Sequence, residues 1–371
     1  MRVLLFSDLH LDTQFKWAPP QLARSRRQGL RDTLAAIVAL AREHRVDALA
    51  CGGDLYEHER FSPDTGEFLR TTFAGLDMPV LLAPGNHDWF GPASLYAQLA
   101  WSPNVHVFTA DTLRPFELAD GFTIWGAAHR APANTDGFLD HFRLDRSGVN
   151  VGLFHASEMG TSRVLEAGKT PHAPFTPAQI SASGLSHAML GHHHVPRDGA
   201  HHTYPGNPDP LSFGEAPGAA GERRGAVLLD FAADGTPTRT RLGVASAHVT
   251  DVVVTLAGPS TAQAVRQQVG AVLAPLSGIV RVTLGGEVAP ELDLRLGDLG
   301  DLAPHLAGLV VRLGRVHVSY DFEALAKEKT VRGRFVSDVM ASMALDEQAR
   351  ARVLVTGLRA LDGRGQELEV H

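Results

Sequence analysis

The chain has a single cysteine among its 371 residues, Cys51. One cysteine excludes a disulfide framework and a cluster of thiolate metal ligands. Cys51 stands within a short apolar run, so we expect it to be a small buried core residue.

The sequence also lacks a long hydrophobic stretch and an excess of positive charge. No apolar run is long enough to span a bilayer, and the first residues enter a predicted strand without the charged and apolar regions of a secretion signal. We therefore expect a cytoplasmic protein with no membrane partner. The formal net charge of −7 argues against nucleic-acid binding through a broad basic surface. It does not exclude nucleic acid, because metal ions bring positive charge of their own into a site.

Five segments of the chain share one pattern, a short apolar run followed directly by polar side chains. Such runs predict buried strands, and open α/β sheets place their sites at the carboxyl ends of strands. We therefore expect the polar side chains to converge on one edge of a sheet and to bind two divalent cations. The segments are 2–10, 46–54, 79–88, 149–155 and 187–194, and their metal-competent side chains are Asp8, His10, Asp54, Asn86, His155, His192 and His194.

Glycines precede three of these side chains, at Gly53, Gly85 and Gly191. We expect them to serve turns that need a positive φ or a close backbone approach. Each segment has a simpler explanation when taken alone: an Asp-x-His can be a turn cap beside a core histidine, and Gly-Gly-Asp is often only a turn. Gly-Asn-His-Asp at 85–88 is more specific, because a tight turn needs neither the histidine nor the second carboxylate. All five segments together favour a metal site.

The length is comfortable for two domains. Strands and helical stretches alternate in the first part of the chain, which predicts a sheet covered by helices on both faces. The Pro-, Ser- and Gly-rich segment 161–186 is predicted to pass over the site. The predicted helices are 21–44, 65–76, 92–100, 260–273, 299–306, 332–343 and 346–361. The predicted units are an α/β domain over 1–245, a small α/β cap over 246–320 and a helical segment over 321–371.

The five segments resemble the five motifs of the calcineurin-like metallophosphoesterase superfamily, over roughly the first 215 residues. The resemblance implies a four-layer α/β sandwich with two metals bridged by one aspartate. It also implies that His87 is the acid or transition-state stabiliser, with Asp88 behind it to fix its tautomer. His193 is given no role. The ligands implied for the first metal are Asp8, His10 and His194, those for the second are Asn86, His155 and His192, and Asp54 bridges both.

The chemistry of phosphodiesters explains why such residues are needed. Two cations about 4 Å apart neutralise the anionic ester, generate hydroxide at neutral pH and hold the incoming and outgoing oxygens. Oxygen and nitrogen ligands without thiolates suit Mn²⁺, with Fe²⁺ or Zn²⁺ also open.

Within the superfamily, the chain is similar to the DNA-repair exonuclease branch, the SbcD-type double-strand-break nucleases. That likeness implies DNA as substrate, a homodimer, and an SbcC-type coiled-coil ATPase as partner. Two positions depart from it: Asp12 stands where the family often has glycine, and Glu57 stands where break-repair nucleases can carry a histidine that helps to place DNA. The likeness rests on 8–11, 53–56, 204–207, 212–215, 329–336 and the small cap.

Candidate substrate contacts are less specific. Arg24 and Arg27, clustered with Arg26 and Arg31, could bind phosphates or form a solvated helix face. Tyr56, with Phe61, could stack on a base or only cover the pocket, and His58 is predicted beside them. The apolar faces of the last two helices could bind the ATPase partner or pack on the cap; they include Phe335, Val339, Met343, Val353, Leu354 and Leu358.

Three functions are compatible with these patterns. The first is a metal-dependent DNA nuclease of a repair complex, an exonuclease for which endonuclease activity stays open. The second is a small-molecule phosphatase or cyclic-nucleotide phosphodiesterase, which needs only the shared metal site. The third is a binding scaffold that has lost catalysis, against which the complete ligand set and His87 argue. The cap and helical segment favour the nuclease over the small-molecule enzyme. The acidic net charge mildly favours the small-molecule enzyme.

Overall fold

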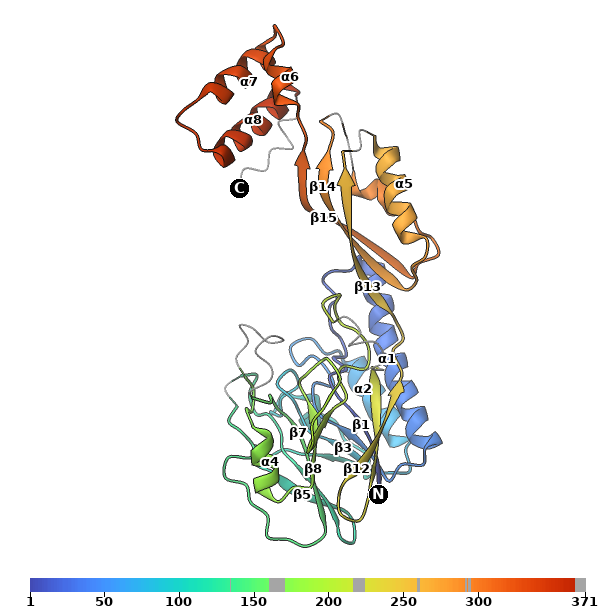
Figure 1. Cartoon of the computed structure of the whole chain (residues 1–371). Helices are drawn as coiled ribbons and strands as arrows, with labels where there is room; N and C mark the ends of the chain where they lie inside the picture. The colour runs from blue at the N-terminus through green and yellow to red at the C-terminus, as the bar shows by residue number, and fades with distance from the viewer. Residues whose placement is uncertain are drawn as a thin grey trace. The chain divides into compact units, whose positions relative to one another are not determined.

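A computed structural model describes residues 1–133, 135–159, 171–215, 224–258, 261–290, 292 and 295–363. The chain divides into two compact units, Met1–Val249 and Thr250–His371 (Figure 1). The division into three parts at 245/246 and 320/321 stays a prediction.

The first unit contains two six-stranded sheets. The first has the order β12-β11-β1-β2-β3-β4 and the second the order β5-β6-β7-β8-β10-β9. The strands of the first sheet are β1 Arg2–Phe6, β2 Ala48–Cys51, β3 Val80–Leu82, β4 Val105–Val107, β11 Gly225–Phe231 and β12 Pro237–Gly243. Those of the second are β5 Arg114–Ala119, β6 Phe122–Gly126, β7 Val149–His155, β8 His187–Gly191, β9 Arg197–Asp198 and β10 His202–Tyr204.

The centre of each sheet is parallel. Strands β1, β2, β3 and β4 run in one direction in the first sheet, and β6, β7, β8 and β10 do so in the second. β11, β5 and β9 pair antiparallel with these centres, and β12 pairs antiparallel with β11. The carboxyl ends of neighbouring parallel strands therefore lie together at one edge of each sheet.

Alternation along β1 shows how the layers form. Leu4 and Phe6 belong to a core shared with helices, whereas Val3 and Leu5 belong to a core between the two sheets. Successive side chains of a strand point to opposite faces, so both faces of this strand are buried. The predicted four-layer α/β sandwich is confirmed.

Helices cover the outer faces of the sheets (Figure 1). α1, Pro20–Glu43, and α2, Pro63–Ala74, pack on the first sheet, and α4, Pro177–Ser183, packs on the second. Ser62 caps α2, because its hydroxyl accepts from Thr65 N at 3.2 Å. Predicted helices 21–44 and 65–76 match α1 and α2 closely. The helix predicted over 92–100 is only one turn, α3, Leu95–Gln98, and α4 was not predicted.

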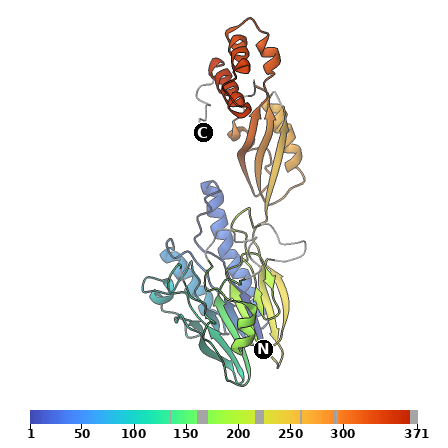
Figure 2. The same ribbon diagram turned by 60° about the vertical axis from the view of Figure 1, so that its left-hand side comes forward.

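The second unit is a three-stranded sheet with helices. β13, Val249–Ala257, is followed in the sheet by β14, Ile279–Val288, and β15, Gly308–Val318. Figure 2 shows α5, Ala262–Leu273, against this sheet, and Val265, Val269 and Leu273 fill the core between them. The helix predicted over 299–306 is wrong: a 3₁₀ turn, η1, covers Leu296–Leu299 instead. The remaining helices are α6 Phe322–Ala326, α7 Val331–Ala341 and α8 Glu347–Leu361.

Two other expectations concern membranes and the cysteine. Among the described residues, no helix has both the length and the apolarity needed to cross a membrane. Cys51 ends strand β2 and is buried, as predicted.

A buried ion pair fastens α1 to two distant segments. Arg26, only 3% exposed, donates to the carboxylate of Asp209 and to Pro210 O, the latter at 3.1 Å. Asp209 also accepts from Thr33 Oγ1 at 2.8 Å and from Ser246 N at 2.7 Å. The helix, the loop after β10 and the chain after β12 therefore meet at one carboxylate.

Removing the arginine should leave that carboxylate buried without its partner. We expect Arg26→Ala to lower the free energy of unfolding by about 3–5 kcal/mol. Arg24→Ala, an exposed change on the same helix, should alter it by less than about 0.5 kcal/mol. Tryptophan fluorescence during urea denaturation reports this unit, because all four tryptophans lie in it, at 17, 89, 101 and 125. Equal effects of the two changes would contradict the role assigned to the ion pair.

Candidate metal centre

The predicted ligands come together at facing edges of the two sheets. Asp8, Asp54 and Asn86 follow β1, β2 and β3 of the first sheet, while His155 ends β7 and His192 follows β8 of the second. The prediction of a single sheet edge is therefore corrected. A cross-sheet hydrogen bond joins the edges, because His155 Nδ1 donates to Gly52 O at 2.9 Å.

The backbone at this point is unusual. Asp8, His10, Asp54 and His192 have φ values of 56°, 52°, 53° and 111°, although none is glycine. Residues with side chains rarely adopt positive φ, and such conformations persist where the surroundings hold them. Here Asp8 N donates to Gly53 O at 2.9 Å and His10 N donates to Asp54 O at 3.0 Å. The left-handed turns are a sign of a functional site.

Glycines make room for these turns, as expected. Gly53 has φ +102°, and a Cβ at Gly191 would lie 2.8 Å from His155 Nδ1. A Cβ at Gly85 would collide with the carboxylate of Asp54 and lie 2.8 Å from its backbone nitrogen. A side chain at any of these positions would displace a predicted ligand.

Asp54 lies at the centre of the site. Its Oδ2 is 3.6 Å from His10 Nε2 and 3.3 Å from His155 Nε2. His155 Nε2 is also 3.0 Å from Asn86 Oδ1. The other carboxylate oxygen of Asp54 accepts from His87 N at 2.8 Å, which fixes its orientation. One oxygen thus lies between histidines predicted to bind different cations, which is the position a bridging carboxylate needs.

The donor atoms suit divalent cations. Possible ligand atoms of Asp8, His10 and His194 lie within 4.8 Å of one another, and the same holds for Asp8, Asp54 and His155. His10 Nε2 is buried and has no hydrogen-bond partner in the described part of the chain. A buried ring nitrogen of this kind is satisfied if it binds a metal ion.

The neighbouring histidines of the last motif differ from each other. His192 N donates to both carboxylate oxygens of Asp8 at 3.1 Å, and its ring centroid is 5.2 Å from that of His155. Burial lowers the pKa of His192 well below its usual value, which favours the neutral ring that binds metal. His193 is buried instead against Tyr204, with ring centroids 4.6 Å apart.

Charge couples Asp54 to the histidines. Burial alone would raise the pKa of Asp54, but the charges of His155, and then of His10 and His87, hold that pKa well below its usual value. Burial would lower the pKa of His155, yet Asp54 and then Asp8 raise it to about 9. A divalent cation between these groups would supply the positive charge that the protons supply without it.

Two glutamates orient the ligand histidines, and their role was not predicted. His10 Nδ1 donates to Glu57 Oε1 at 2.8 Å, and His194 Nδ1 donates to Glu215 Oε1 at 2.9 Å. A carboxylate on Nδ1 leaves Nε2 to bind metal. Although burial opposes it, the hydrogen bonds from these histidines hold the pKa of both carboxyls at about 2. Glu215 lies in segment 212–215, which carries part of the resemblance, whereas Glu57 follows segment 53–56 and the sequence shows it only as a departure from the family pattern.

The role expected of Asp88 is corrected. Asp88 is buried and accepts from Gly85 N at 2.6 Å, Leu55 N at 2.7 Å and Tyr96 OH at 2.5 Å. Burial and the charge of Asp54 raise its pKa to about 6. Glu57 Oε2, at 3.3 Å from His87 Nδ1, is the carboxylate that contacts the His87 ring. Asp88 therefore holds the turn, and Glu57 orients the histidine.

The predicted substrate contacts differ in their exposure and in their contacts. Tyr56 is fully buried and its hydroxyl accepts from Leu95 N at 2.9 Å, so it packs in the core and cannot stack on a base. His58 is partly exposed and lies against Trp89, with ring centroids 4.0 Å apart. Arg24 is exposed and Arg27 partly exposed on α1. The other two arginines of that cluster are engaged: Arg26 with Asp209, and Arg31 with Asp64 at 2.6 Å.

The segment predicted to pass over the site is described only in part. Residues 161–170 lie outside the described residues. In the described remainder, the ring centroid of His172 lies 5.6 Å from that of His192. This part of the segment does reach the metal centre.

Removing either orienting glutamate should weaken metal binding. We expect Glu57→Ala and Glu215→Ala each to lower Mn²⁺ affinity about 10–100-fold, because His10 or His194 would lose its fixed orientation. Glu57→Gln should lose less, since an amide oxygen still accepts from Nδ1. Glu117→Ala, an exposed change on β5, is the control. Isothermal calorimetry measures the affinities, and unchanged binding in both variants would refute the orienting role.

Metal binding should also release protons. His155 has a pKa raised to about 9 without metal, so it is protonated at about pH 7.5 and must lose its proton to become a ligand. Affinity should therefore rise with pH up to about 9. Calorimetry in two buffers of different ionisation enthalpy should show the release of at least about one proton. Heats that do not depend on the buffer would contradict this expectation.

The model of the family described as calcineurin-like phosphoesterase matches residues 1–196. "Uncharacterized metallophosphoesterase YhaO" of Bacillus subtilis (strain 168) is 29% identical over 202 residues, which are 51% of this chain and 47% of that protein. "DNA double-strand break repair protein Mre11" of Methanopyrus kandleri is 26% identical over 269 residues, which are 62% of this chain and 54% of that protein. The chain spans about half the length of these curated relatives.

Solved structures give a weaker likeness. The crystal structure of TT1561 of Thermus thermophilus is 14% identical, with a TM-score of 0.38, and the match covers 65% of this chain and 98% of that one.

The family match takes in more than half of the chain, and all seven predicted ligands lie within it. The layered sandwich and the gathering of these side chains around Asp54 agree with it. The chain belongs to the calcineurin-like phosphoesterase family.

Proposed function

We propose that this chain is a metal-dependent DNA nuclease that hydrolyses phosphodiester bonds with two divalent cations. The main support is the oxygen of Asp54 that lies between His10 and His155, in a family of phosphoesterases. The likeness to a protein named for DNA double-strand break repair favours DNA as the substrate. The activity proposed is that of an exonuclease, and endonuclease activity stays open.

The metal ligands follow from the arrangement of the donors. Asp54 would bridge two cations, the first held by Asp8, His10 and His194 and the second by Asn86, His155 and His192. Carboxylate, amide and imidazole donors without thiolates suit Mn²⁺, with Fe²⁺ and Zn²⁺ as alternatives.

His87 would act as the acid of the reaction. When bound, two cations would neutralise the phosphate and make a hydroxide nucleophile available at neutral pH. The His87 side chain is about half exposed, and its ring centroid is 4.8 Å from that of His10. Although burial opposes it, the hydrogen bond to Glu57 and the charge of Asp54 raise its pKa to about 9, which favours the protonated imidazole. With Nδ1 facing Glu57, Nε2 is the nitrogen that gives this proton to the leaving oxygen.

A small-molecule phosphatase or a cyclic-nucleotide phosphodiesterase could use the same centre. The α/β cap and its helices favour the nuclease, because a small substrate needs only the first unit. The net charge of −7 does not help to attract DNA, so the local site has to supply the attraction.

The partner proposal concerns the last helices. Leu354 and Leu358 of α8 are buried with Val336 of α7, so these side chains pack within the second unit. Met343 is 99% exposed and Val353 is 38% exposed. We propose these exposed apolar side chains as the contact for an SbcC-type coiled-coil ATPase. The homodimer is proposed from the family resemblance alone.

A substrate panel separates the two enzyme classes. The purified protein with Mn²⁺ should shorten end-labelled duplex or single-stranded DNA. Cyclic nucleotides tested in parallel should be poorer substrates. Turnover of cyclic nucleotides without cleavage of DNA would reject the nuclease.

Two substitutions separate the acid from the bridging ligand. We expect His87→Ala to keep both metals but to lower kcat about 10²–10⁴-fold, because the leaving oxygen loses its proton donor. Asp54→Ala should lose metal. His141→Ala, an exposed histidine, is the matched control. Metal content per chain and kcat are the measurements, and near-full activity of His87→Ala would show that another group is the acid.

A further inference from the structure

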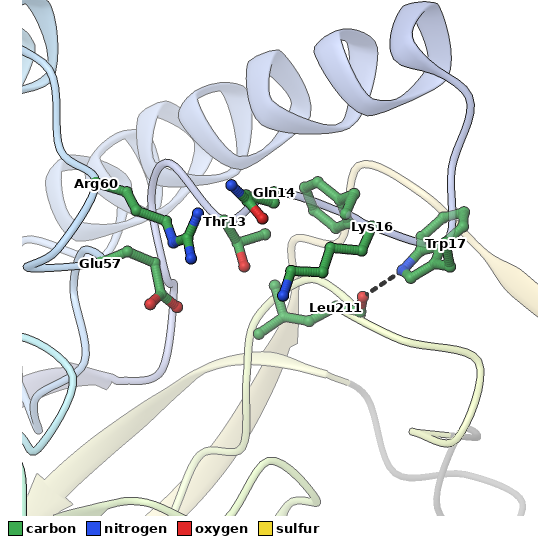
Figure 3. Close-up of a pocket in the computed structure, with 8 residues that line it drawn as sticks. Thr13, Gln14, Lys16, Trp17, Glu57, Arg60 and Leu211 are labelled. Atoms are coloured by element: carbon green, nitrogen blue, oxygen red, sulfur yellow. Dashed lines mark hydrogen bonds between the residues drawn. The ribbon is translucent and has the colours of Figure 1, made fainter.

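A pocket of about 280 Å³ lies beside the metal centre (Figure 3). The loop 13–17, Glu57, Arg60 and Leu211 line it. Glu57 belongs to both places, because its carboxylate contacts His10 and His87. The pocket therefore shares a wall with the residue that contacts both a predicted metal ligand and the proposed acid.

The loop that forms the pocket is fastened to α2. Asp12 has φ 68°, and its carboxylate accepts from Ser62 N at 3.1 Å and from Thr65 Oγ1 at 2.6 Å. Aspartate tolerates this left-handed conformation, and here its side chain also holds the loop.

Aromatic contacts hold the other end of the loop. Trp17 Nε1 donates to Leu211 O at 2.9 Å, and its ring centroid lies 4.6 Å from that of Phe213 and 5.7 Å from that of Phe15. Phe15 has φ 49° and is buried. A loop held at both ends loses little conformational entropy when a ligand binds.

The charge in the pocket is positive. Figure 3 shows the side chains of Lys16 and Arg60 reaching toward the same space from different segments. Both residues are exposed, and within the described residues no ion pair or side-chain hydrogen bond joins either to a neighbour. The acid of this pocket, Glu57, has its two oxygens directed to His10 and His87 at 2.8 and 3.3 Å. The positively charged side chains of Lys16 and Arg60 thus remain to bind an anionic ligand.

We propose that Lys16 and Arg60 bind a second phosphate group of the substrate, adjacent to the phosphate that is hydrolysed. Arginine offers paired donors to phosphate oxygens and lysine a compact charge, and Trp17 offers an aromatic surface beside the attached nucleoside. This inference rests on the proposed function and names what it selects: a substrate with at least two phosphates. The second phosphate belongs either to the next nucleotide of a DNA strand or to a nucleoside polyphosphate.

Charge-deleted substrates test the pocket directly. In the trinucleotide TpTpT, one linkage is replaced by an uncharged methylphosphonate, which also resists cleavage, so the other linkage is the one hydrolysed. Two isomers place the neutral linkage on either side. For one isomer we expect wild-type kcat/KM to fall about tenfold relative to TpTpT. In a Lys16→Ala/Arg60→Ala variant this difference should disappear, because a double-mutant cycle reports the interaction between the deleted charges.

Control variants remove the same charges elsewhere. Lys327→Ala lies in the second unit and Arg114→Ala on β5, and both residues are exposed. Both controls should keep the wild-type ratio between the two substrates. Equal Mn²⁺ content of all variants shows that the metal centre is intact.

A second arm identifies the source of the phosphate. Hydrolysis of thymidine 5′-triphosphate is measured with the same variants. A roughly tenfold loss of kcat/KM for the triphosphate, with no cleavage of TpTpT by wild type, would support the pocket but reject the nuclease. A different result would overturn the pocket but leave the nuclease intact. In that case wild type cleaves TpTpT, and the ratio of kcat/KM between TpTpT and the methylphosphonate isomer is the same in the double variant as in wild type. The pocket would also be overturned if neither methylphosphonate isomer lowered the kcat/KM of wild type.

Discussion

The Asp54 carboxylate is the group on which the rest of the first unit depends. Its oxygen lies within 3.6 Å of ring nitrogens on His10, which follows β1 of the first sheet, and on His155, which ends β7 of the second. Burying that charge is costly unless positive charge is close. The two sheet edges, the left-handed turns and the side-chain-free glycines all serve to keep imidazoles, and then cations, around this carboxylate. The fold is therefore organised by an electrostatic requirement as much as by its apolar layers.

Orientation comes from a second set of carboxylates. Glu57 and Glu215 each bind Nδ1 of a ligand histidine, and Asp88 collects backbone donors that hold the turn around Gly85. These three acids occupy different positions but act alike: each replaces conformational freedom of a ligand segment with fixed hydrogen bonds. Glu57 has a wider role because it also contacts His87 and borders the pocket of Lys16 and Arg60. Glu57 thus takes part in three features: it orients a predicted metal ligand, contacts the proposed acid and lines the substrate pocket.

Much of this could be predicted from the sequence because strand and ligand are neighbours in it. Asp8 comes two residues after β1, and His155 is the last residue of β7, so alternation and apolar runs locate both. What could not be predicted depends on contacts between distant positions. The hydrogen bond from His10 to Glu57 joins residues 47 positions apart, and the burial of Tyr56 depends on Leu95, 39 positions away. The pairing of two sheets instead of one, and the short α3 and η1, likewise depend on tertiary packing that local patterns do not encode.

The crowding at Gly53, Gly85 and Gly191 has an evolutionary consequence. A methyl group at these positions would meet Asp54, His155 or the opposite sheet edge, so a lineage cannot drift there without giving up the centre itself. The pocket of Lys16 and Arg60 is not crowded in this way, because both side chains are exposed to solvent. Sequence changes among such enzymes would therefore accumulate around this pocket. New substrates could be acquired in this way while the metal centre stays unchanged.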